Sequence, residues 1–173
     1  RSALEDRAAN ELTQVRQIAA SGNLPLASRQ LKQFVSKYSG TRAGAEGRLL
    51  LGQMLLQQNQ AKEAAPVVQP LASDLGDPLG PPAAFLLGAA YEGMNNVAQA
   101  EATYLRIADG ARFEFQKRDA LEDAARLKLQ NNDPAGAVSL YERILKAVPD
   151  TAVGRPVYEM RLAEAQAAAQ AKK

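Results

Sequence analysis

Apolar residues recur at three- and four-residue steps along most of this chain, which predicts amphipathic helices. Short polar stretches, or stretches rich in glycine and proline, interrupt the pattern where helices would end. Nine helical segments are expected between these interruptions: about Leu4–Ala20, Pro25–Tyr38, Ala43–Gln58, Lys62–Asp74, Ala83–Met94, Val97–Asp109, Glu114–Gln130, Pro134–Val148 and Pro156–Ala171.

The same short motif returns in four of these segments. An alanine is followed four residues later by a large apolar residue, and the alanines lie 37, 36 and 37 residues apart: Ala27 and Leu31, Ala64 and Val68, Ala100 and Tyr104, Ala137 and Tyr141. A fixed period in this range marks a stacked repeat, in which each unit buries its apolar face against its neighbours. The chain is therefore expected to be one row of helical hairpins, all-α in class.

We expect a single domain over residues 1–173, with repeats at about 4–38, 43–75, 82–109 and 114–148 and a capping helix at 156–171. Two places are less regular. Pro66 and Pro70 should kink their helix or delay its regular start, because proline removes a backbone donor. The turn-rich stretch between Gly76 and Pro82 should be a loop between repeats.

Two mid-helix glycines, Gly52 and Gly88, indicate close helix contact, because glycine costs a helix about 1 kcal/mol relative to alanine. With these residues the repeats resemble the tetratricopeptide repeat (TPR). The third repeat carries the resemblance best, through Leu87, Gly88, Tyr91, Ala100 and Tyr104. The second keeps Leu51, Gly52 and Ala64, and the fourth keeps Ala137, Tyr141 and Pro149. The resemblance implies a right-handed TPR-like solenoid of four antiparallel hairpins, closed by the C-terminal helix.

The resemblance also implies a concave groove lined by the first helix of each repeat. Residues one step past each core stripe should face it: Leu12, Arg16, Leu49, Gln53, Leu56, Phe85, Ala89, Glu92, Glu122, Arg126 and Leu129. Such a groove, apolar in the middle, suits an amphipathic helix or an extended apolar peptide. The competing interpretation is that Leu49, Leu56 and Phe85 contact neighbouring helices, since core and groove positions differ by one residue.

TPR proteins that hold a C-terminal carboxylate use lysine, asparagine and arginine at matching groove positions. This chain has Leu12 with Arg16, then Leu49 with Gln53, then Phe85 with Ala89, so that clamp is not expected.

Composition narrows the chemistry further. The chain has no cysteine and no histidine, which excludes disulfides, the usual zinc sites and cysteine or histidine catalysis. We expect no cofactor, no metal and no small-molecule substrate. The net charge of +2 is not the clustered basic footprint of a nucleic-acid binder.

Two local clusters could carry chemistry. One cluster has paired carboxylates that could serve as a general acid and base: Arg118, Asp119, Glu122, Asp123 and Arg126. Acidic and basic residues at three- and four-residue spacing are more typical of a solvated helix face, which is the expectation here. Phe113 and Phe115 stand among basic residues and could stack on bases. We expect instead that this aromatic pair fixes its loop to the third repeat.

The repeat ends KYSGTRAGAEGRLLLG and KAVPDTAVGRPVYEMRLAEA are similar to junctions of bacterial cell-envelope TPR proteins, including outer-membrane assembly lipoproteins and the periplasmic subunit associated with the Sec translocon. The resemblance implies a periplasmic or envelope location, with a cytoplasmic location as the alternative. No run of about 18 apolar residues is present, so contact with a membrane is expected only through an anchor upstream of Arg1.

The sequence thus predicts a non-catalytic scaffold that binds a protein or peptide partner, in envelope protein assembly or translocation. Two alternatives stay open at this point. The chain could be a structural module that forms homo-oligomers through its terminal helices, or an accessory TPR domain of a larger regulator or enzyme.

Overall fold

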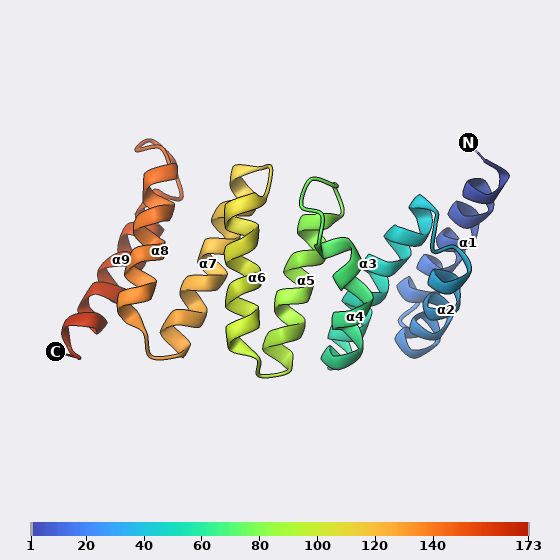
Figure 1. The fold of residues 1–173 in the computed structure, drawn as a ribbon, viewed down its shortest axis with the longest axis horizontal. Coiled ribbons are helices and arrows are strands. Elements are labelled where there is room, and N and C mark those ends of the chain that lie inside the picture. Colours follow the sequence, from blue (N-terminus) through green and yellow to red (C-terminus); the bar gives the residue numbers. More distant parts are fainter. Residues whose placement is uncertain (1, 173) are drawn as a thin grey trace. The chain divides into compact units, whose positions relative to one another are not determined.

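The computed structural model describes residues 2–172, and every regular element in that range is a helix (Figure 1). The helices are α1 (Ala3–Ala20), α2 (Leu24–Lys37), α3 (Arg42–Gln57), α4 (Ala61–Ala72), α5 (Gly80–Gly93), α6 (Val97–Gly110), α7 (Glu114–Gln130), α8 (Pro134–Ala147) and α9 (Arg155–Gln170). The all-helical class predicted from the periodicity is confirmed. No helix among the described residues is both long and apolar enough to span a membrane.

The helices group into two compact units. Helices α1 to α5 form the first unit, and helices α6 to α9 form the second. Within each unit every helix packs on the next one along the chain. In the first unit α1 also contacts α3, and α3 contacts α5, so the first helices of successive hairpins lie side by side.

The repeat period is visible in the backbone of the turns that close the hairpins. Gly22, Asn59, Asn95 and Asn132 each adopt a left-handed conformation, with φ of 89°, 58°, 57° and 62°. Glycine and asparagine tolerate this region best. In three of the turns the next amide donates to a carbonyl five residues back, as Gln60 N does to Leu55 O at 2.8 Å. These bonds satisfy carbonyls at the end of the helix. The same stop signal therefore recurs once per repeat.

Several helices begin at a side chain that caps their first turn. Ser2, Asn23, Thr41 and Asp133 each accept a hydrogen bond from the amide three residues later. The bond from Gly44 N to Thr41 Oγ1 and the bond from Gly136 N to Asp133 Oδ1 are both 2.9 Å long. Such caps satisfy amides that have no partner inside the helix.

The prolines of the first unit behave differently from the sequence-based expectation. The start expected at Ala83 is wrong, because α5 begins at Gly80 and includes Pro81 and Pro82. Proline is tolerated in a first turn, where its missing N–H would have no helical partner. A Cβ at Gly80 would lie 1.7 Å from Asp74 O, so only glycine lets the helix start against this backbone.

In α4 the expected delay does not occur. The helix starts at Ala61, and Pro66 and Pro70 both lie inside it.

The core of each unit contains the residues that define the period. Ala27, Ala64, Ala100 and Ala137 are all fully buried. Their partners four residues later are also buried: Leu31, Val68, Tyr104 and Tyr141. The alanines leave room for the neighbouring helix, and the larger partners fill the space between helices. The sequence repeat is thus a repeat of packing.

Candidate protein-binding surface

The most continuous candidate surface lies on α3 and α5 in the first unit. On α3 it consists of Leu49, Gln53 and Leu56, and on α5 of Phe85, Ala89 and Glu92. Both sets have spacings of four and then three residues, so each lies along one side of its helix. Gln53 is exposed and the other five are partly exposed. We call these six residues the α3–α5 surface.

The α3–α5 surface has the composition expected of a docking site. Leu49, Leu56 and Phe85 are apolar and none of them is fully buried, whereas the core residues Leu51 and Leu55 on α3 are 2% and 0% exposed. Gln53 and Glu92 supply hydrogen-bonding groups at the same surface. Partly exposed apolar groups beside a few polar ones are typical of interface centres.

Helix α1 contributes less to this face than its sequence indicates. Leu12 is only 2% exposed and belongs to the core, so its assignment to an accessible groove is wrong. Its neighbour Arg16 is exposed, as expected. Leu12 and Arg16 are four residues apart and lie on the same side of α1, so this side of the helix holds both a buried and an exposed position.

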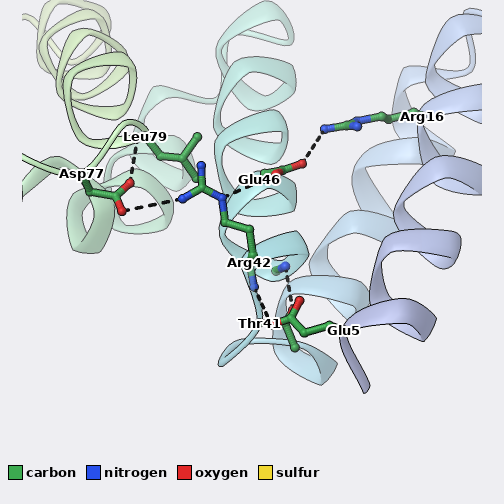
Figure 2. Close-up of polar contacts among 8 residues, drawn as sticks. Glu5, Arg16, Thr41, Arg42, Glu46, Asp77 and Leu79 are labelled. Atoms are coloured by element: carbon green, nitrogen blue, oxygen red, sulfur yellow. Dashed lines mark hydrogen bonds and ion pairs between the residues drawn. The ribbon is translucent and has the colours of Figure 1, made fainter. Parts of the chain in front are cut away.

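A chain of polar contacts links α1, α3 and the loop before α5 (Figure 2). Glu46 accepts a hydrogen bond from Arg16 at 3.2 Å and pairs with Arg42 at 3.6 Å. Arg42 also pairs with Asp77 at 3.7 Å, and its amide donates to Glu5 Oε1 at 3.1 Å. These side chains are about one-third to one-half exposed, so each pair contributes only about 0–1 kcal/mol.

The hollow beside these contacts lies between α1 and α3. It has a volume of about 280 Å³, with Leu12, Ala9 and Ala43 among its lining residues. Charged side chains, including Arg16, complete the lining. It is a small, charged extension of the first-helix face rather than a deep pocket.

In the second unit, the structure brings Glu122, Arg126 and Leu129 together in one hollow of about 500 Å³. Leu129 is 41% exposed, and the other two are partly exposed. Tyr141 of α8 and Arg161 of α9 also line this hollow. The fourth repeat therefore offers an accessible first-helix face, and this face is more polar than the α3–α5 surface.

Each of the three carboxylates in the α7 cluster has a basic partner. Glu122 accepts hydrogen bonds from Arg161 Nη1 and from Tyr158 Oη, the latter at 3.0 Å. Asp123 pairs with Arg126 at 3.1 Å, and Asp119 pairs with Arg118 at 3.5 Å. Burial, followed by the hydrogen bond to Glu122, raises the pKa of Tyr158. The arrangement is that of ion pairs and a hydrogen bond that orient these side chains.

No group of acidic side chains among residues 2–172 is arranged to hold a metal ion. The aromatic pair expected to fix the loop before α7 does not do so. Phe113 and Phe115 are 52% and 54% exposed, which makes that expectation wrong.

Comparison with known proteins identifies the repeats. The sequence pattern of the tetratricopeptide repeat family matches residues 12–74 and 122–173, which together make up more than half of the chain. The chain belongs to the tetratricopeptide repeat family. The matched residues include Gly52, Ala64 and Tyr141, which confirms the TPR resemblance in the second and fourth repeats, whereas Tyr91, Ala100 and Tyr104 of the third repeat lie outside them. No curated protein sequence matches the chain.

Among solved structures, the TPR chain is similar to a protein from Podosopora anserina that is designated a kinesin light chain with nearly identical TPR-like repeats. The TM-score is 0.73 at 18% identity, over 95% of this chain and 87% of that one. A Q17M form of the same protein gives 0.74 at 17% identity, over 98% and 90%. At this level of identity the likeness shows the fold alone. Proteins with TPR repeats generally act as non-catalytic scaffolds for protein–protein interaction.

The sequence analysis did not predict two residues of α9, Tyr158 and Arg161, that contact Glu122. Adding one period of 36 residues to Glu122 leads to Tyr158, so extending the repeat into α9 would have found it. Arg161 carries no such signal, because a long side chain reaches Glu122 from one turn further along α9.

Proposed function

We propose that this TPR chain is a non-catalytic scaffold that binds an apolar peptide segment or an amphipathic helix on the α3–α5 surface. The observation that carries the proposal is the alignment of partly exposed Leu49, Leu56 and Phe85 on two helices in contact. Burying such side chains against a partner contributes about 25 cal/mol for each Å² removed from water. Gln53 and Glu92 would fix the orientation of the bound segment through polar contacts.

A binding experiment with matched variants tests this surface. Peptides of about 15 residues, which make roughly four helical turns, are selected from a displayed library against the chain. The proposal predicts apolar or amphipathic peptides whose affinity falls at least tenfold in Phe85→Glu. The control is Val67→Glu, which places the same charge at a partly exposed apolar position on α4 and should leave the affinity unchanged.

The thermal stability of Phe85→Glu separates binding from folding. If Phe85 faces the partner, binding is lost while the melting temperature changes by only a few degrees. A large fall in melting temperature would make Phe85 a core residue and would remove the α3–α5 surface as the binding site. Equal losses of affinity in the two variants would also count against this surface.

We further propose that the scaffold works in the bacterial cell envelope, in protein assembly or translocation. The support is the similarity of the junctions around Tyr38–Thr41 and Pro149–Thr151 to envelope TPR proteins, together with the absence of cysteine. The test is protease treatment of spheroplasts from a bacterium that makes the full-length protein. Digestion before lysis places the repeats outside the cytoplasm, and protection until lysis would place them inside.

A further inference from the structure

We draw no further inference here: the strongest candidate, the exposed apolar side of α9 formed by Val157, Met160, Ala163 and Ala167, carries nothing because the structure does not show what covers it.

Discussion

Gly52 allows α3 and α4 to approach closely, and adding one methyl group there should destabilise the first unit. An ideal Cβ at residue 52 would lie 2.2 Å from Cγ1 of Val68. Carbon atoms in favourable contact are about 3.5–4.0 Å apart. Val68 is fully buried, and a β-branched side chain in a helix has one strongly preferred rotamer. The methyl group of Gly52→Ala therefore has no cheap way to fit.

The size of the effect follows from two opposing contributions. Alanine in place of glycine favours the helix by about 1 kcal/mol. Overpacking in a dense core typically costs about 1–3 kcal/mol, and an overlap of more than about 1 Å belongs at the upper end. We therefore expect Gly52→Ala to lower the free energy of unfolding by about 2 kcal/mol.

The same geometry predicts that Gly52→Ala changes from destabilising to stabilising when Val68 is also replaced by alanine. The ideal Cβ at residue 52 is 3.7 Å from Cβ of Val68, which is an ordinary contact. In Val68→Ala the clashing Cγ1 is gone, so Gly52→Ala should then stabilise the protein by about 1 kcal/mol through helix propensity. The coupling between the two positions is about 3 kcal/mol, at the upper end for residues in contact.

A double-mutant cycle tests this coupling. Urea denaturation, followed by circular dichroism at 222 nm, measures the free energy of unfolding of the wild type, the two single variants and the double variant. Gly40→Ala is the control, because nothing lies within 4 Å of its ideal Cβ, and its effect should stay within about 0.5 kcal/mol. A stabilising effect of Gly52→Ala in the wild-type background, or the same effect in both backgrounds, would refute the close-packing account.

Three further predictions concern polar groups. Hydrogen bonds from Lys37, and then from Tyr38, lower the pKa of Glu11, so its stabilising contribution is present above the ordinary pKa and is lost as pH falls through the lowered value. Glu11→Gln should thus be less stable than wild type at pH 7, with a difference that shrinks below about pH 4.5 in acid titrations of unfolding. Asp133→Ala should cost about 1 kcal/mol in urea denaturation by removing the cap of α8, whereas Asp133→Ser should recover most of it. Gln116 Oε1 is buried without a hydrogen-bond partner, so Gln116→Met should raise the melting temperature, and an unchanged or lower value would argue that this oxygen is solvated.

The fold could be predicted from sequence because its signals are local and repeated. The turns at Gly22, Asn59, Asn95 and Asn132 are each set by residues a few positions away. The alanine positions predict packing because only a small residue fits at the closest contact, and Gly52 is the sharpest case. The predicted start of α5 is wrong because proline usually marks a loop, whereas Pro81 and Pro82 lie in the first turn of this helix, which accepts proline.

The candidate site was harder to predict because exposure and pairing depend on residues that are distant in the sequence. Leu12 and Arg16 share one helix, yet one is buried and the other is exposed. The pairing of Glu122 with Arg161 and Tyr158 joins residues more than 35 positions apart. The sequence predicts that Phe113 and Phe115 pack against the third repeat, but Phe113 directly precedes α7, Phe115 lies in its first turn, and both are exposed.

The central claim is that a protein partner binds the α3–α5 surface, and site-specific photocrosslinking tests it most directly. A photoreactive amino acid replaces Gln53 on α3 or, as the matched control, Gln69 on α4, in the full-length protein in bacterial cells. Both glutamines are exposed and belong to the same unit. We predict a discrete crosslinked protein from position 53 and none from position 69. Crosslinks from position 69 alone, or equally from both positions, would contradict the claim.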